Sequence, residues 1–211
     1  MKLKICGMKY QENINQVTEI NPDFLGFIFY EKSSRFFDGE IPNLTKEISK
    51  VGVFVNASIE YVLDKVNHHH LDYIQLHGNE TPEYCKKLKA KTNSKTIKVF
   101  SIKDEFNFTV LSQFEVICDY FLFDTKGTLP GGNGYSFDWS VLENYPSTKP
   151  YFLSGGIGLE NVTDLQEFLS SPAAQYCYAI DVNSKFEIEP GLKDTTKLTE
   201  FKELLKPTSN V

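Results

Sequence analysis

"YFLSGGIGLENVTDLQEFL", residues 151–169, contains the pattern that decides the fold. It begins with a short apolar run, Tyr151–Leu153, which is typical of a buried strand. Gly155 and Gly156 follow and are typical of a turn. Apolar residues then recur at helical spacing, at Val162, Leu165, Phe168 and Leu169. The stretch therefore predicts a strand, a glycine turn and a helix that packs back onto the strand.

The strand pattern occurs eight times along the chain. The runs are rich in β-branched and aromatic residues and cover Lys2–Ile5, Phe24–Phe29, Val51–Val55, Tyr73–Leu76, Thr96–Phe100, Tyr120–Phe123, Tyr151–Leu153 and Tyr178–Val182. Most intervals carry helical apolar spacing, such as Ile59, Val62, Leu63 and Val66 after the third run, as parallel strands with crossover helices require. The sequence predicts an α/β fold, a single (βα)8 TIM barrel domain with eight parallel strands over residues 1–211. A doubly wound sheet is the alternative, but "CGMKY" (6–10) lacks its glycine fingerprint.

The composition is that of a globular protein with a mild excess of negative charge. Hydrophobic residues make up 41% of the chain, and the formal net charge is −6. This charge disfavours nucleic-acid binding, in which a basic surface supplies much of the affinity. The apolar runs are far shorter than the roughly 20 residues that span a bilayer, and Met1–Met8 lacks the apolar core of a signal peptide. We therefore expect a cytoplasmic protein without nucleic-acid or membrane partners, whose four scattered cysteines are free thiols.

In a barrel of this kind, the active site lies at the carboxyl ends of the strands. Polar residues or glycines follow most of the predicted strands there: Cys6, Arg35, Asn56, His77, Asp124, Gly155, Gly156, Asp181 and Ser184. The glycine pair and Ser184 follow the seventh and eighth strands, which form the usual phosphate corner of such barrels. Glycine lets the backbone approach an anion closely, so these positions predict a phosphate site, with an ordinary turn as the alternative.

Cys6 and Asp124 are a second pair with possible chemistry. A thiolate can remove a proton and a protonated carboxyl group can deliver one, so the two could act as an acid/base couple across the barrel mouth. Each also has a plain structural explanation. Cysteine is commonly a small buried apolar residue, and an aspartate after a strand commonly caps a helix.

The ordered set of strand ends resembles the phosphoribosylanthranilate isomerase family of tryptophan biosynthesis. The resemblance covers Lys4 to Asp194 and is carried by "KICGM", "PDFLGFIFYEKSSRF", "VGVFVN", "IQLHGNE", "FLFDTKG", "PGGNGYSFDW", "LSGGIGLENV" and "AIDVNSKFEIEPGLKD". It implies an Amadori rearrangement of a small phosphorylated substrate, with no metal and no organic cofactor. Asp124 is then the general acid at the furanose ring oxygen, and Cys6 the general base at C2′.

The resemblance also assigns substrate contacts. Arg35 matches the family position that meets the anthranilate carboxylate, whereas its structural alternative is an exposed arginine beside Glu31. The phosphate-binding loops match at Gly155, Gly156 and Ser184. Asp181 lies where a sugar hydroxyl could be held, although a hydrogen-bonding role at the mouth is nearly as well supported. His77 faces the same mouth, and its structural alternative is a histidine without substrate contact.

Two positions depart from the family pattern, and one cluster stays outside it. Lys185 stands where many relatives have glycine, and Asn133 replaces a small hydroxyl residue in the glycine-rich segment. "NHHH", residues 67–70, is expected to form a solvated helix end rather than a metal site.

The alternative functions are another phosphosugar barrel enzyme, such as indole-glycerol-phosphate synthase or the histidine-pathway isomerase, and a non-catalytic phosphate-binding barrel. Cys6 disfavours the first, because those enzymes are expected to use lysine or aspartate in this role. A binding protein would not need Cys6 and Asp124 together. The sequence leaves open whether the chain is a monomer or a homodimer.

Overall fold

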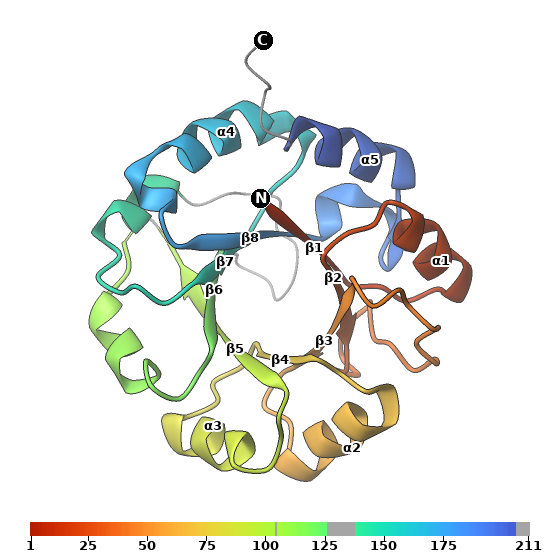
Figure 1. The fold of residues 1–211 in the computed structure, drawn as a ribbon, viewed down its shortest axis with the longest axis horizontal. Helices are drawn as coiled ribbons and strands as arrows, with labels where there is room; N and C mark the ends of the chain where they lie inside the picture. The colour runs from red at the N-terminus through yellow and green to blue at the C-terminus, as the bar shows by residue number, and fades with distance from the viewer. Residues whose placement is uncertain (104, 126–137, 206–211) are drawn as a thin grey trace.

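The computed structural model describes residues 1–103, 105–125 and 138–205. Eight parallel strands close into a barrel in chain order, with β8 hydrogen-bonded to β1 (Figure 1). The strands are β1 (Lys2–Cys6), β2 (Phe24–Ile28), β3 (Ser49–Phe54), β4 (Tyr73–Leu76), β5 (Lys95–Ile102), β6 (Tyr120–Thr125), β7 (Tyr151–Leu153) and β8 (Cys177–Val182). The predicted fold class, an α/β TIM barrel of eight parallel strands, is confirmed.

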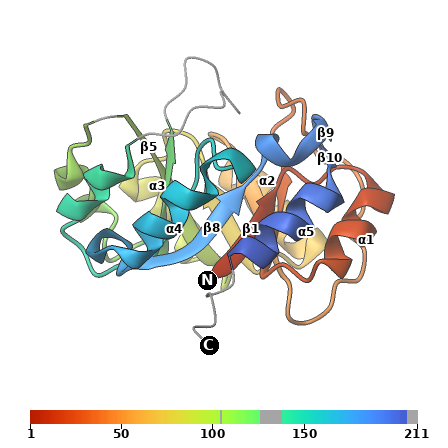
Figure 2. The ribbon, with the colours of Figure 1, turned by 90° about the horizontal axis from the view of Figure 1, so that it is seen from above.

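Helices surround the barrel on its outer side, as both ribbon views show (Figures 1 and 2). The α-helices of the described residues are α1 (Gln11–Glu19), α2 (Ile59–His69), α3 (Pro82–Lys89), α4 (Val162–Ser170) and α5 (Thr195–Leu204). Short 3-10 helices follow β5 and β6, namely η1 (Phe108–Gln113) and η2 (Trp139–Asn144). The helices expected from the apolar spacing after β3 and β7 are therefore present. None of the described helices is both long and apolar enough to cross a bilayer.

The connection between β2 and β3 contains no helix, although it is described throughout. Its first part forms turns and then lies beside the end of β2: Phe36 forms a parallel bridge with Ile28, and the Phe37 N–H donates to the Ile28 carbonyl at 2.8 Å. The Phe37 ring is buried against Phe27 at a centroid distance of 5.0 Å. A segment of turns with one buried ring, Phe37, therefore packs on β2 in place of a helix.

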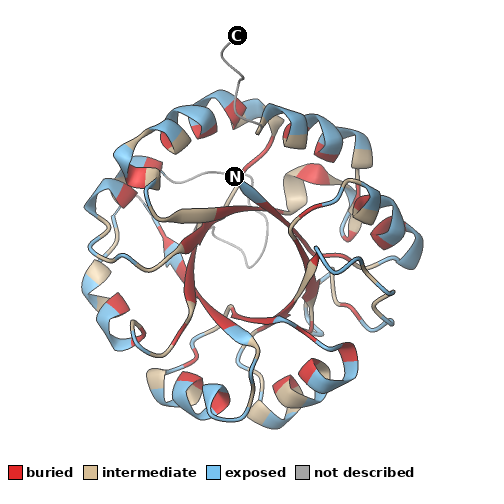
Figure 3. Cartoon of the chain, viewed as in Figure 1, coloured by how far each residue is buried: buried red, intermediate tan, exposed pale blue. Residues whose placement is uncertain are grey.

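Two apolar cores hold the fold together. The larger one fills the space between the strands and the outer elements, and most of the strand ring is coloured as buried in Figure 3. The smaller core lies inside the barrel, where rings from non-adjacent strands touch: Phe24 of β2 lies 5.3 Å from Tyr73 of β4 and 5.3 Å from Phe152 of β7. Because these contacts cross the barrel, they identify which strand positions point inward.

Side-chain alternation then predicts which residues reach the mouth of the barrel. Strand residues two positions apart share a face. Asp181 follows the inward Ala179 by two positions, and Asp124 follows the inward Leu122 by two. Lys4 is paired in register with Asp181 and bonds to it, so Lys4 and Cys6 of β1 also point inward. The carboxyl ends of β1, β6 and β8 thus direct a thiol and two carboxylates into one space.

Candidate active site

Cys6 ends β1 and lies directly beside β2. It pairs in register with Gly26, and a Cβ atom at that glycine would lie only 2.8 Å from the Cys6 sulfur. Gly26 therefore leaves room for the thiol. Cys6 is 5% exposed, so almost all of it is shielded from solvent. Burial raises the pKa of Cys6, while the ammonium groups of Lys4 and Lys193 favour the thiolate and offset part of that effect.

Lys4 and Asp181 form a fully buried ion pair beneath Cys6. The Lys4 ammonium donates to the Asp181 carboxylate at 2.8 Å, and both side chains are shielded from water. Burial alone would lower the pKa of Lys4, but the charges of Asp181 and Cys6 raise it, so the lysine stays protonated. A permanent cation therefore lies next to the thiol, with Asp181 as its counter-ion.

Replacing Lys4 by methionine should cost about 3 to 5 kcal/mol of folding free energy at neutral pH, because Asp181 is left charged and unpaired in the interior. Burial raises the pKa of Asp181. The deficit should therefore shrink as pH falls and the carboxylate takes up a proton. Urea unfolding at several pH values measures both effects. Lys2→Met, at an exposed lysine of the same strand, is the control and should cost less than about 1 kcal/mol. A pH-independent deficit in Lys4→Met would contradict this explanation.

Asp124 lies on the opposite side of the mouth and is held by His77. The His77 Nε2 atom is 3.3 Å from Asp124 Oδ2, and the Gln75 amide nitrogen contacts His77 Nδ1 at 3.1 Å. Because Gln75 donates to Nδ1, the hydrogen of a neutral His77 is on Nε2 and faces Asp124. Both Asp124 and His77 are partly exposed, which leaves the carboxylate open to a ligand. The structure thus places His77 against Asp124, and a contact of His77 with the substrate stays a prediction.

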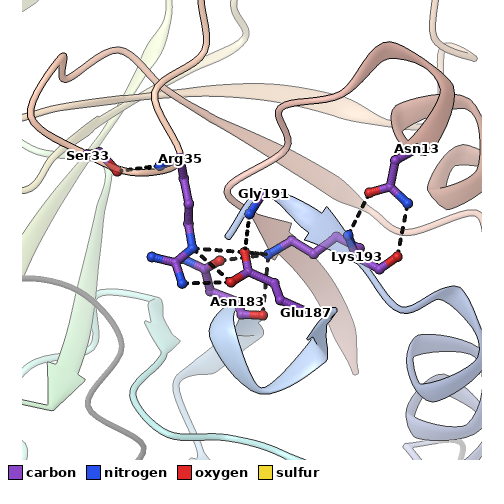
Figure 4. Close-up of polar contacts among 7 residues, drawn as sticks. All are labelled: Asn13, Ser33, Arg35, Asn183, Glu187, Gly191 and Lys193. Carbon is purple, nitrogen blue, oxygen red and sulfur yellow. Dashed lines mark hydrogen bonds and ion pairs between the residues drawn. The ribbon is translucent and has the colours of Figure 1, made fainter. Parts of the chain in front are cut away.

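Arg35 is paired with Glu187, not with Glu31 as its structural alternative suggested (Figure 4). Arg35 Nε and Nη2 donate to the two oxygens of Glu187 at 2.8 and 2.6 Å, a bidentate fork. The buried Lys193 ammonium donates to the same carboxylate at 2.7 Å. Burial would raise the pKa of Glu187, but the hydrogen bonds and charges of Arg35 and Lys193 lower it. The fork uses one edge of the guanidinium and leaves the Nη1 donors for a second anion.

Glu187 and Lys193 come from a short antiparallel ribbon after β8, formed by β9 (Glu187–Glu189) and β10 (Leu192–Lys193). Asn13 of α1 fastens this ribbon through two backbone bonds, at 2.7 and 2.9 Å, to Lys193 (Figure 4). The ribbon is thereby tied to the helix that follows β1.

Gly7, the residue after β1, leaves room for the side chains of Arg35 and Asn183 to lie against the end of that strand. Its φ is +79°, and a Cβ atom there would lie 2.7 Å from Asn183 Oδ1 and 2.9 Å from Arg35 Cδ. Asn183 Oδ1 in turn accepts from Lys193 at 2.7 Å. Arg35 and the residues after β8 are therefore in contact with the residue that follows Cys6.

The predicted phosphate residues follow β7 and β8, which are hydrogen-bonded neighbours. Gly155 and Gly156 have φ values of +96° and +66°, so two consecutive residues adopt the left-handed conformation that favours glycine. Ser184 begins η5 (Ser184–Phe186) directly after β8. Lys185, one of the two departures from the family pattern, pairs with Glu160 of η3 (Leu159–Asn161) at 2.5 Å. Asn133 and the glycine-rich segment around it lie outside the described residues.

Comparison with known proteins identifies the family. The sequence model of a family described as N-(5′-phosphoribosyl)anthranilate isomerase matches residues 3–203. The chain belongs to this family. A phosphoribosylanthranilate isomerase from Parabacteroides distasonis is 44% identical over 98% of this chain and 95% of its own length.

Solved structures of the phosphoribosylanthranilate isomerase family superpose closely. The enzyme from Thermus thermophilus has a TM-score of 0.79 at 25% identity and covers 97% of this chain and 98% of its own. Another, in complex with reduced 1-(o-carboxyphenylamino)-1-deoxyribulose 5-phosphate, has a TM-score of 0.73 at 29% identity, with 95% and 96% covered.

Within this phosphoribosylanthranilate isomerase barrel, the structure adds three charged residues that the sequence analysis did not select. Lys4 stands between apolar neighbours at an inward strand position, which is a detectable signal for a paired internal charge. Glu187 and Lys193 lie past the last strand, and their partners are distant in sequence. No local pattern indicates those contacts.

Proposed function

We propose that this chain catalyses the Amadori rearrangement of N-(5′-phosphoribosyl)anthranilate to 1-(2-carboxyphenylamino)-1-deoxyribulose 5-phosphate in tryptophan biosynthesis. The observation that carries the proposal is the direction of Cys6 and Asp124, which point into one barrel from the carboxyl ends of β1 and β6. Family membership supports the same reaction. We further propose a cytoplasmic chain that folds as one barrel domain and acts as a monomer or a homodimer, which light scattering distinguishes.

The first step opens the sugar ring. Asp124, in its protonated form, delivers its proton to the furanose ring oxygen, and the C1′–O bond breaks while the anthranilate nitrogen forms an iminium. His77, 3.3 Å away, orients the carboxyl group through its Nε2 atom. The lone pair of the anthranilate nitrogen forms the new C=N bond as the C1′–O bond breaks. The substrate itself therefore supplies the electrons, and the step needs no cofactor.

The second step removes the proton from C2′, which the iminium has made acidic. The Cys6 thiolate takes this proton and yields an enolamine, which tautomerises to the ketone. Burial disfavours the thiolate, but two lysines lie near it. Lys4 stays protonated beside Asp181. Burial lowers the pKa of Lys193 to about 8, so this second cation is lost in alkaline solution. The positive charges of Lys4 and Lys193 stabilise the Cys6 thiolate, which is buried away from water.

The two ends of the substrate are held apart in this proposal. The free edge of the Arg35 guanidinium binds the anthranilate carboxylate, since Glu187 occupies only the other edge. Gly155, Gly156 and Ser184 bind the 5′-phosphate through backbone and hydroxyl donors at the ends of β7 and β8. Asp181 stays with Lys4, which supports its role as the counter-ion of that lysine rather than as a sugar ligand.

Glu187→Gln should raise KM about tenfold or more while changing kcat less, because Arg35 loses the charged acceptor that fixes its guanidinium. Steady-state kinetics with the phosphoribosyl substrate measure KM and kcat separately. The control is Glu189→Gln, in the exposed neighbour whose carboxylate accepts from the Tyr10 hydroxyl at 3.4 Å. Glu187→Asp should recover part of the affinity. An unchanged KM in Glu187→Gln would show that Arg35 does not need this support.

The function itself is tested by complementation of a tryptophan auxotroph that lacks this isomerase, together with the decay of anthranilate fluorescence in vitro. Growth and turnover are expected. A barrel that binds the product analogue without turnover would instead be the non-catalytic phosphate-binding alternative. Turnover of another phosphosugar but not of this substrate would favour a different enzyme.

A further inference from the structure

The end of α2 carries three ligand-type side chains outside the barrel. His68 and His69 form its last turn, and Glu40 approaches from the connection between β2 and β3. The sequence predicted a solvated helix end here. The structure agrees at Asn67, His68 and His70, which are exposed, and differs at His69, which is buried at 6% exposure. None of the three takes part in the proposed reaction.

The donor atoms of these residues lie close together. His68 Nε2 is 2.9 and 3.1 Å from the two oxygens of Glu40. One ligand atom from each of Glu40, His68 and His69 lies within 4.8 Å of the other two. The two imidazole rings are 4.5 Å apart and nearly perpendicular at 87°, so they do not stack on each other. The three side chains thus bring one ligand-type atom each into a single cluster.

The His69 ring is held in place by aromatic contacts, but one of its nitrogen atoms lacks a hydrogen-bond partner among the described residues. The ring stacks on Phe29 at 5.1 Å and meets the edge of Phe37 at 6.0 Å. Its Nδ1 atom is buried and has no hydrogen-bond partner among the described residues. A buried polar atom of this kind calls for an explanation, and a metal ion is one.

The surrounding charges are mixed. Lys65 and Lys50 oppose a cation at His69. Lys50 is engaged, since it donates to the His69 carbonyl at 2.6 Å, and Lys65 lies 3.7 Å from the Asp64 carboxylate. Glu40 contributes a full negative charge, and the carbonyl end of α2 contributes a partial one. Both lysines thus have other partners, and Glu40 supplies the charge that favours a cation.

We propose that Glu40, His68 and His69 bind a Zn²⁺ ion, with water as the fourth ligand. Two imidazoles and a carboxylate are a common zinc donor set, and nitrogen donors disfavour Mg²⁺ and Ca²⁺. Zinc bonds of about 2.0 to 2.1 Å place tetrahedral donors roughly 3.3 Å apart. The donors can close to that spacing because the Glu40 and His68 side chains are 79% and 52% exposed.

Isothermal titration of the purified full chain with ZnCl₂ tests the proposal. One saturable site per chain is expected in the wild type. His68→Ala and Glu40→Gln should each weaken it by about tenfold or more, as loss of a ligand requires. His70→Asn is the matched control, because His70 is the left-handed C-cap outside the cluster, and asparagine tolerates that conformation.

Zinc should also raise the melting temperature of the wild type but not of His68→Ala. Both substituted side chains are exposed, so the variants are expected to fold, and their far-ultraviolet circular dichroism checks this. Absence of saturable binding, or equal binding by the wild type and both variants, would overturn the proposal. In the second case the ion would be bound elsewhere, for example by the free thiols.

Discussion

Cys6→Ser is expected to lower kcat/KM by about 10² to 10⁴-fold, the range that a general base contributes. The serine hydroxyl is far less acidic than a thiol, so it cannot provide a base form near neutral pH, although it occupies similar space beside Gly26. The measurement is the decay of anthranilate fluorescence with enzymatically generated substrate. Binding of a product analogue should change little, because the thiol holds neither the phosphate nor the carboxylate.

Two further readouts separate catalysis from packing. Cys177→Ser is the control, since Cys177 begins β8 at the opposite end of the barrel strands, and its rate should stay near that of the wild type. The pH profile is the second. The thiolate fraction of Cys6 rises with pH, from a pKa that burial has raised, whereas a proton donor is lost with pH. The wild type should show a bell-shaped kcat/KM, and an unchanged rate in Cys6→Ser would reject the base assignment.

Asp124→Asn should cause a loss of similar size, about 10² to 10⁴-fold in kcat/KM. Asparagine keeps the shape and can still contact His77, but it has no proton to deliver to the ring oxygen. The same fluorescence assay measures the rate. Asp138→Asn is the control, because that aspartate caps η2 on the outer side through the Ser140 N–H at 2.9 Å.

The result that would contradict the acid assignment is specific. If Asp124→Asn loses affinity for the product analogue in parallel with its rate, the carboxylate acts in binding. If His77→Gln loses the rate while Asp124→Asn does not, the imidazole 3.3 Å away is itself the acid. A double variant of Cys6 and Asp124 should be little slower than the slower single variant if both steps are required for one turnover.

Much of the fold could be predicted from the sequence because a buried strand requires a short, uninterrupted run of apolar residues, and such a run is visible locally. Tyr73–Leu76 and Tyr151–Leu153 match the predicted strands residue for residue. Apolar periodicity after β3 predicted α2 in the same way. The segment after β2 was less informative, since it folds into turns, with Ser33 N–H bonded to the Tyr30 carbonyl, and then returns to β2 through the bond from Phe37 to Ile28. Local periodicity does not record that choice.

By itself, the sequence determined the barrel and the residues at the carboxyl ends of its strands, since the strand pattern and the strand ends follow from residue order. Only the tertiary structure decided their partners. Arg35 bonds to Glu187 across 152 residues, and Lys4 to Asp181 across 177. It also buried His69 while leaving its neighbour in water. The reason is that closing the barrel brings β8 beside β1, and charge pairing over such separations depends on that closure rather than on any local pattern.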